Sequence, residues 1–471
     1  MVPAKTSMED ASGVKTDEVV DNSPTVSAPA IPDEGRAGSL FPSIPSTSKL
    51  LPVAYSFADQ ALAVGGGFLV NIALARTQSK EEYGLFALSY TVFAFLLGLY
   101  YAAILEPYTV YASGRYRGRF SEYLRLMVRS NVVLCVLLTG VLLLGCLLLH
   151  WIAPPLLPRA FIGLALTAGV LLSGYFLRRI FYVQRQPGLA AKSSLIFLVT
   201  LAGGLWLLAR TKHIDSFTVF PALALGWIAA GAVFARKLHF GKPEQSFLET
   251  EPKYWREHWS YSKWVLATAF VFQFTHQGYY WLVGGFLSAK EVANLRAMYL
   301  LVGPVEQVFI ALSYLIVPAL SAHYASKRMD DFFSLWKRYG LATLGISGLY
   351  AVLVRIVGRP VVHVLYAGKY DGLAPYLFLL TLVPFVMWIG GTMGHALNAV
   401  EKPHFVFWAY LSSGAATFLL GIPLVIRFGL WGAVYGMLVS AATYTAALAV
   451  SFVFRFWADW RGLQPIALPK A

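Results

Sequence analysis

Residues 57–107 read FADQALAVGGGFLVNIALARTQSKEEYGLFALSYTVFAFLLGLYYAAILEP and contain two long apolar runs joined by a short polar turn. Each run is long enough to cross a bilayer, which takes about 20 helical residues. The first run nevertheless opens with Asp59 and Gln60, and the second closes on Glu106 and Pro107. Ionisable groups are costly in lipid, so we expect these side chains to face protein or a water-filled cavity.

The composition of the whole chain supports a membrane protein. The 471 residues are 57% hydrophobic and only 13% charged, and the mean hydropathy is +0.60. Continuous apolar runs predict an all-α polytopic protein, since a helix satisfies its own backbone hydrogen bonds in lipid, whereas a barrel would show alternation. The net charge of +14 follows from basic loops on one side of a membrane, so we expect no nucleic-acid partner.

Runs of mostly apolar residues predict about twelve transmembrane helices. The predicted spans are 53–75, 83–105, 124–149, 160–183, 192–209, 216–235, 263–287, 296–320, 339–358, 374–396, 405–426 and 430–456. They divide the chain into a disordered cytoplasmic tail (1–50), an N-terminal six-helix lobe (51–235), a cytoplasmic inter-lobe loop (236–262), a C-terminal six-helix lobe (263–457) and a cytoplasmic C-terminal tail (458–471).

Basic residues set the orientation, and weak internal similarity suggests a duplication. Alternate loops are richer in Lys and Arg, with Arg178 and Arg179 counted among them, so both termini are predicted in the cytoplasm. Three pairs of short segments repeat at an offset of about 210 to 216 positions: Lys80-Glu81 with Lys290-Glu291, Glu106-Pro107 with Val317-Pro318, and Gln184-Arg185-Gln186-Pro187 with Val400-Glu401-Lys402-Pro403. Two copies of a six-helix unit share one topology, as in two-lobed transporters.

Polar side chains recur at helical spacing inside several spans, which favours a central cavity or hydrogen bonds between helices. On the seventh span the stripe is Gln273, His276, Gln277 and Tyr280, and on the eighth it is Arg296, Tyr299, Gly303, Gln307 and Tyr314. The tenth span carries Thr381, Trp388, Thr392 and His395, and the first carries Gln60, Gly67 and Asn71. Aromatic rings beside amides suit a sugar or another bulky amphiphile.

Three carboxylates are candidates for ion coupling: Asp59, Glu106 and Glu306. A buried carboxylate has a raised pKa and can load and release a proton, so the coupling ion would be H⁺ or Na⁺. The alternative for Asp59 and Glu106 is a structural ion pair, for which Arg129 is the expected partner because it enters from the same side.

Motifs of enzymes are absent from the sequence: there is no GxxxxGK[ST], HExxH, GxSxG or paired-cysteine metal motif. We therefore expect no catalytic residues, no metal site and no cofactor.

The pattern DQ…GGGFLVNIALAR…SKEEYGLFAL…EPYTVY resembles the N-terminal signature of Wzx-type polysaccharide flippases of the multidrug/oligosaccharidyl-lipid/polysaccharide (MOP) exporter superfamily. The resemblance implies a MATE-like V-shaped fold of two six-helix bundles with alternating access. It also implies that Asp59 corresponds to an acidic position used for coupling by some drug exporters, and that arginines such as Arg129 and Arg296 line the cavity.

The function implied is flipping or export of undecaprenyl-diphosphate-linked oligosaccharide or a related glycan. The setting would be exopolysaccharide or O-antigen assembly at the bacterial inner membrane, with polysaccharide polymerase or export machinery as possible partners. A multidrug exporter of the same superfamily and a membrane-embedded glycan polymerase or ligase are the alternatives. The last would need a large catalytic loop outside the cytoplasm, for which only residues 355–371 qualify.

Overall fold

The computed structural model describes residues 47–114, 116–152, 156–237 and 245–460, which belong to one compact unit, Ile44–Ala471. Most of the predicted tail 1–50 and most of the predicted tail 458–471 lie outside these residues, whereas 47–50, predicted to be disordered, begin a helix. Every regular element in the described part is helical, which confirms the all-α prediction.

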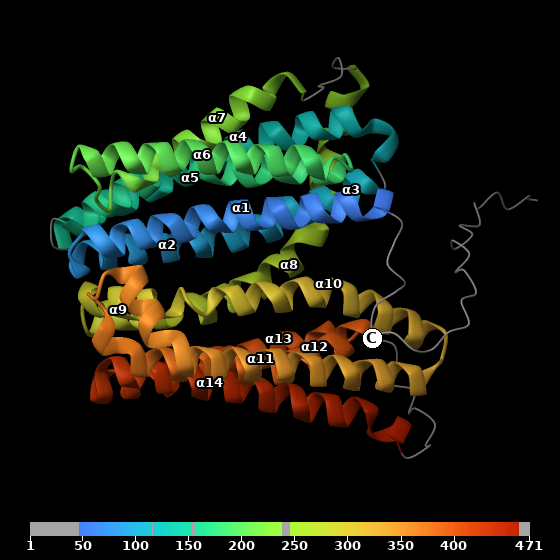
Figure 1. Cartoon of the computed structure of the whole chain (residues 1–471). Helices are drawn as coiled ribbons and strands as arrows, with labels where there is room; N and C mark the ends of the chain where they lie inside the picture. The colour runs from blue at the N-terminus through green and yellow to red at the C-terminus, as the bar shows by residue number, and fades with distance from the viewer. Residues whose placement is uncertain (1–46, 115, 153–155, 238–244, 461–471) are drawn as a thin grey trace, which may run out of the picture. The chain divides into compact units, whose positions relative to one another are not determined.

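The helices form two groups (Figure 1). The first group is α1 (Thr47–Thr77), α2 (Lys80–Tyr100), α3 (Glu106–Ser113), α4 (Phe120–Ile152), α5 (Leu156–Val183), α6 (Pro187–Arg210) and α7 (Val219–Phe234). The second is α8 (Gln245–Phe286), α9 (Ala289–Tyr299), α10 (Gly303–Ala325), α11 (Met329–Tyr366), α12 (Ala374–Ala399), α13 (Pro403–Leu419) and α14 (Gly421–Trp460). We call the end with the α1–α2 turn the outer end, and the opposite end, predicted to be cytoplasmic, the inner end.

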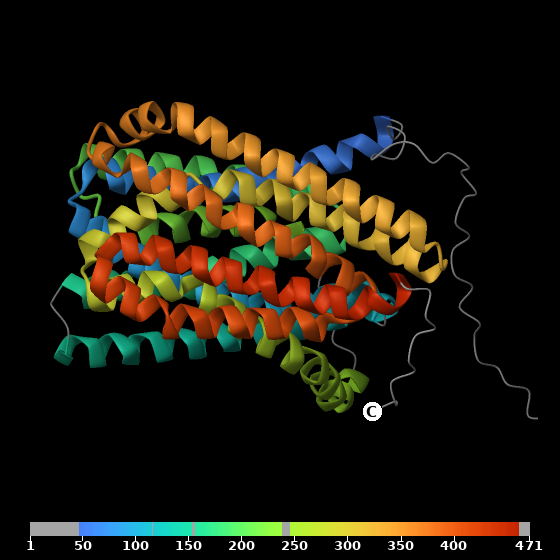
Figure 2. The ribbon, with the colours of Figure 1, turned by 90° about the horizontal axis from the view of Figure 1, so that it is seen from below.

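Nine helices in the described part are long and apolar enough to cross a membrane. The three other predicted spans fall on α7, on α8 and on α13 with the start of α14. The most apolar of the nine, α4, exposes Val136, Val141 and Leu144 to more than half their area, and it lies at the edge of the bundle in Figure 2. An apolar face of this size needs lipid around it, so the chain is a multi-pass membrane protein.

Matching helix ends support the internal similarity. Ser79 and Ser288 cap α2 and α9 by accepting the backbone N–H of Glu82 and Glu291, at 3.1 and 3.3 Å. A serine before a glutamate three residues on is the capping-box pattern of a helix start. The turns that precede Pro187 and Pro403 also share one backbone hydrogen-bond pattern, at an offset of 216 positions.

Residues 245–262 differ from the prediction, which placed them in a loop. They form the first part of α8, where Tyr254, His258 and Ser262 are buried at intervals of four residues. This spacing puts them on one helix face. The charged residues between them hid that periodicity, because they made the segment look like a solvated loop.

The docking of α8 depends on Pro107. Proline has no N–H, so the carbonyl four residues earlier, that of Ala103, loses its helical donor. Ala103 lies in a π-helical turn, Tyr101–Leu105, and its oxygen accepts from His258 Nε2 at 2.7 Å and from Ser262 Oγ at 3.2 Å. Burial lowers the pKa of His258, against the effect of the Ala103 bond, so the ring is neutral near pH 7.

The two groups of helices meet closely at the outer end, where α2 packs against α9. Gly84 is so near the other group that a Cβ on it would lie 1.8 Å from the carbonyl oxygen of Ala289. Lys369 donates to the carbonyls of Ala75, at 3.1 Å, and of Gln78, so it caps the end of α1. The Lys80 ammonium stands 4.7 Å from the ring centre of Tyr370. Backbone contact and lysine capping therefore close the outer end.

We predict that Gly84→Ala destabilises the protein by about 1–3 kcal/mol, the usual cost of overpacking, because a backbone carbonyl cannot move aside as a side chain can. The measurement is the thermal unfolding midpoint of the purified protein at a fixed heating rate. Gly285→Ala is the matched control, since a Cβ there meets nothing within 4 Å. An equal midpoint for both variants would show that the two helices do not approach this closely.

Candidate functional site

Arg296 lies where the two groups of helices meet, and it defines the candidate site. Its Nε donates to Asn71 Oδ1 of α1 at 3.1 Å. Its guanidinium carbon stands 4.9 Å from the ring centre of Tyr90 and 5.8 Å from that of Tyr280. The Tyr83 hydroxyl donates to the same Asn71 oxygen at 3.0 Å and holds the amide in place. The site thus draws on α1, α2, α8 and α9.

The charge of Arg296 is not balanced by a direct ion pair. The side chain is half-buried, and among the described residues no carboxylate oxygen comes within 4.0 Å of its guanidinium. A guanidinium without a carboxylate partner keeps N–H groups that can donate to a ligand. Their planar, forked arrangement matches the oxygens of a phosphate or a carboxylate. Arg296 can therefore recognise an anion that enters between the two groups of helices.

Aromatic and acidic side chains extend the site along α8 and α10. The Tyr299 ring contacts His276 and Tyr280 edge to face, with centroids 6.5 and 6.4 Å apart. Its hydroxyl donates to Glu306 Oε1 at 2.7 Å. Of the predicted α8 stripe, His276 and Tyr280 thus reach the site. Gln273 packs instead on Gly98 of α2, and the buried Gln277 bonds to Gln273 at 3.5 Å.

The predicted stripe from Arg296 to Tyr314 is wrong as a single helix face. The chain leaves the helix after Tyr299 and re-enters it at Gly303, with Pro304 in the first turn of α10. A proline there has no N–H to continue the earlier helix. Tyr314, on α10, is 76% exposed.

A second polar cluster surrounds Asp59, nearer the inner end. Asp59 is fully buried, and its Oδ2 lies 2.7 Å from Arg178 Nη2, with further contacts from Arg178 Nε at 3.0 and 3.2 Å. The hydroxyls of Tyr182 and Ser194 donate to the two carboxylate oxygens at 2.7 and 2.5 Å. Two-point pairing with Arg178 and two hydroxyl donors satisfies the carboxylate of Asp59 and joins α1, α5 and α6.

The predicted partner of Asp59 and Glu106 is wrong. Asp59 pairs with Arg178, and Glu106 accepts from Tyr261 at 3.2 Å at an exposed position, so neither uses Arg129, which is itself exposed. Arg178 escaped prediction because it sits in an Arg-Arg pair at the end of a span and was counted with the loop charges. The signal that could have identified it is the polar pair Arg178 and Tyr182, four residues apart on one face of α5.

One chain of hydrogen bonds leads from this cluster to the second group of helices. Arg178 Nη2 donates to Gln60 Oε1 at 3.2 Å, and Gln60 Nε2 donates to Gln307 Oε1 of α10 at 3.5 Å. Gln60 and Gln307 were both predicted to line a cavity. In the structure they form a long, exposed contact between the two groups of helices.

Trp388 and His395 belong to a third cluster inside the second group. The Trp388 ring lies 4.3 Å from Phe309 and 5.9 Å from His395, centre to centre. His395 Nδ1 is hydrogen-bonded to the Tyr339 hydroxyl at 3.1 Å. These contacts join α10, α11 and α12, so the structure does not bring the two residues to Arg296.

Comparison with solved structures identifies the fold. No protein-family model matches the sequence, and no curated protein sequence matches it. An inward-facing multidrug resistance MATE family transporter of the MOP superfamily is similar, with a TM-score of 0.72, 11% identity, and 88% of this chain and 99% of that chain covered.

Two further structures are similar. The lipid II flippase MurJ, in an inward closed conformation, has a TM-score of 0.63 and 14% identity, with 85% and 87% of the chains covered. An outward-facing conformation of a MATE family transporter gives 0.59 and 11%, with 87% and 96% covered. The protein therefore has the fold of the MOP superfamily transporters, as the resemblance implied.

We predict that Asp59→Asn lowers stability by about 3–5 kcal/mol, because it leaves the Arg178 charge buried without its carboxylate. The measurement is the unfolding midpoint together with the amount of protein in the membrane. The double variant Asp59→Asn/Arg178→Gln should regain much of the loss, because it removes both charges.

The double variant also distinguishes a structural role of Asp59 from an ion-coupling role. If the role is structural, a brace between helices, transport should return when the double variant folds. Wild-type stability in the Asp59→Asn protein, with transport lost in both variants, would contradict the brace and favour coupling at Asp59.

Proposed function

We propose that this protein is a transporter that flips or exports lipid-linked oligosaccharide or polysaccharide intermediates by alternating access. The observation that carries the proposal is Arg296, a half-buried cation between the two groups of helices with no direct carboxylate partner among the described residues. The MOP fold supplies the setting, since its members with solved structures include a MATE transporter and a lipid II flippase. The protein would act at the bacterial inner membrane, with both termini in the cytoplasm.

The chemistry of the site suits a glycan carried on a diphosphate lipid. The Arg296 fork can bind phosphate oxygens through two parallel hydrogen bonds. The half-buried rings of Tyr90 and Tyr299 offer apolar faces for a sugar. The lipid would stay in the bilayer while its head group crosses. Undecaprenyl diphosphate is the carrier we propose, with polymerase or export machinery downstream.

The state described is inward-facing under this proposal. Gly84 and Lys369 close the outer end, whereas the Gln60–Gln307 contact nearer the inner end is long and exposed. The agreement is also better with the inward-facing MATE structure, at a TM-score of 0.72, than with the outward-facing one, at 0.59. A substrate made in the cytoplasm would load from the inner end.

Glu306 is the carboxylate best placed to couple an ion. It is half-buried and has one hydrogen-bond donor, Tyr299, whereas Asp59 is saturated by three partners. A carboxylate with few donors can exchange a proton or accept Na⁺ at low cost. Tyr299 contacts Tyr280, which stacks under Arg296, so the ion site would adjoin the substrate site.

A multidrug exporter is the alternative that Glu306 supports, since a carboxylate among aromatic rings also suits an organic cation. Resistance to cationic dyes on expression would favour it. A membrane-embedded glycan polymerase or ligase, from a different class, finds less support. The candidate catalytic stretch 355–371 is mostly the end of α11, and its Lys369 is engaged in capping α1.

Arg296→Gln should abolish complementation of a flippase-deficient strain, with lipid-linked oligosaccharide accumulating, because the anion loses its two-point donor. Removal of a charged hydrogen-bond partner costs about 1.5–3 kcal/mol, or roughly 10- to 100-fold in affinity. Arg359→Gln, an exposed arginine on α11, is the control and should keep activity. Normal export by Arg296→Gln protein present at wild-type levels would refute the anion site.

Glu306→Gln should slow head-group translocation in proteoliposomes and make the rate independent of an imposed cation gradient, because the amide carries no charge to bind a coupling cation. Glu401→Gln, in an exposed turn, is the matched control and should behave as wild type. A wild-type response to the gradient in Glu306→Gln would place coupling elsewhere.

A further inference from the structure

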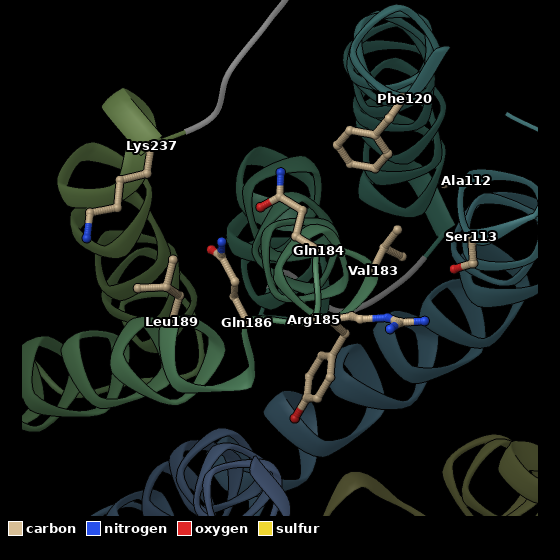
Figure 3. Close-up of a pocket in the computed structure, with 10 residues that line it drawn as sticks. Ala112, Ser113, Phe120, Val183, Gln184, Arg185, Gln186, Leu189 and Lys237 are labelled. Carbon is tan, nitrogen blue, oxygen red and sulfur yellow. The ribbon is translucent and has the colours of Figure 1, made fainter. Parts of the chain in front are cut away.

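A second binding site lies in the first group of helices, apart from Arg296. A cavity of about 870 Å³ opens where the inner ends of α3, α5 and α6 meet the start of α4 and the turn after α7. Figure 3 shows Arg185 and Lys237 on opposite sides of it, with Gln184 and Gln186 between them. The aromatic side chains of Phe120 and Tyr182 also line the cavity. The volume falls within the range of small-molecule sites, about 300–1,000 Å³.

The cavity sits at the boundary of the membrane. The span that contains α5 ends at Val183, and the next begins at Pro187, so the lining turn between them marks the level where the apolar helices stop. This is the end that the distribution of Lys and Arg predicts to be cytoplasmic. A ligand there can keep its apolar part in the bilayer and its polar part among the side chains of the turn.

The lining is cationic. Arg185 and Lys237 are the charged members among its described lining residues, both are exposed, and neither takes part in an ion pair with a described residue. Gln184 and Gln186 add amide donors. Two cations and several donors around an open cavity match a phosphate group.

The equivalent turn in the second group of helices shows that folding does not require this charge. Arg185 has a φ of 58° and Glu401 a φ of 60°, and the hydrogen bonds around them correspond one to one. Both positions are left-handed, yet one carries a cation and the other an anion. The shape of the turn therefore does not account for the arginine at this position.

We propose that this cavity binds the phosphate head group of an anionic phospholipid from the predicted cytoplasmic leaflet. Basic pockets between transmembrane helices at a cytoplasmic surface recognise such head groups. Arg185 would contact the phosphate, Gln184 and Gln186 the polar part beside it, Lys237 the polar part on the opposite side of the cavity, and Phe120 the first part of the chains. The proposal does not depend on what the protein transports.

Tyr182 links the cavity to the buried ion pair. Its side chain lines the cavity, and its hydroxyl donates to Asp59 Oδ2 at 2.7 Å. A bound head group would therefore restrain the side chain that helps to hold α5 on α1. Lipid binding should stabilise the protein as well as occupy the cavity.

The test is native mass spectrometry of the full-length protein titrated with phosphatidylglycerol, phosphatidylcholine or water-soluble glycerol phosphate. We expect phosphatidylglycerol to bind at least about fivefold more tightly than phosphatidylcholine, as charged hydrogen bonds at exposed positions allow. Arg185→Glu should remove that preference, and Arg185→Lys should keep most of it. The glutamate variant should fold, because the equivalent turn carries Glu401 at this position.

Lys402→Glu reverses a charge in that equivalent turn and serves as the matched control, which should keep the preference for phosphatidylglycerol. Lys237→Gln should weaken the binding of phosphatidylglycerol by the few-fold that is typical for the loss of one exposed cation. Unchanged lipid preference in Arg185→Glu, or equal loss in Lys402→Glu, would overturn the site. Glycerol phosphate binding as tightly as the lipid would overturn its assignment to a phospholipid.

Discussion

The carbonyl of Ala103 must find a donor, and much of the arrangement of helices follows from that need. An unpaired backbone carbonyl between apolar helices is costly, and Pro107 removes its normal partner. His258 and Ser262 supply the missing hydrogen bonds from one face of α8. The helix that connects the two groups is thereby fixed to the first group before it continues into the second. A proline that looks like a helix breaker in the sequence acts as a docking point.

The Asp59–Arg178 pair shows the same requirement for charged groups: a buried charge needs a partner, as a buried carbonyl does. Burying either ion alone would be strongly unfavourable, and the pair is tolerated because its geometry is good and hydroxyls satisfy the remaining oxygens. The pair and its two hydroxyl donors tie α1, α5 and α6 together. Arg178 also reaches Gln60, which contacts Gln307, so the brace ends at the boundary with the second group. The Gln60–Gln307 contact is long and exposed, so it is the weakest of these hydrogen bonds.

The apolar runs sufficed to predict the all-helical fold and, roughly, the number of spans, because crossing a bilayer imposes a length and a composition that few other structures need. The partners of individual side chains were harder to predict from the sequence. Arg178 and Arg129 are both arginines near span ends, and only packing shows which one meets Asp59. The break after Tyr299 was missed although Pro304 was visible, since prolines inside transmembrane helices often only kink them. The cavity beside Arg185 is lined by three stretches that are distant in sequence, around Ala112, Arg185 and Lys237, so no local pattern could have revealed it.

Under the proposed function, Arg296 has two competing partners, and this competition can connect binding to movement. In the state described, Arg296 bonds to Asn71 across the boundary between the two groups. An anionic substrate that binds through Nε as well as through the free Nη donors would displace Asn71 and remove a contact that holds the outer end closed. A ligand shifts a conformational equilibrium only by its differential affinity for the two states. Losing one charged hydrogen bond, about 1.5–3 kcal/mol, supplies a shift of useful size, while Gly84 and Lys369 supply the remaining resistance to opening. Substrate loading from the inner end would then weaken the closure at the outer end, as alternating access requires.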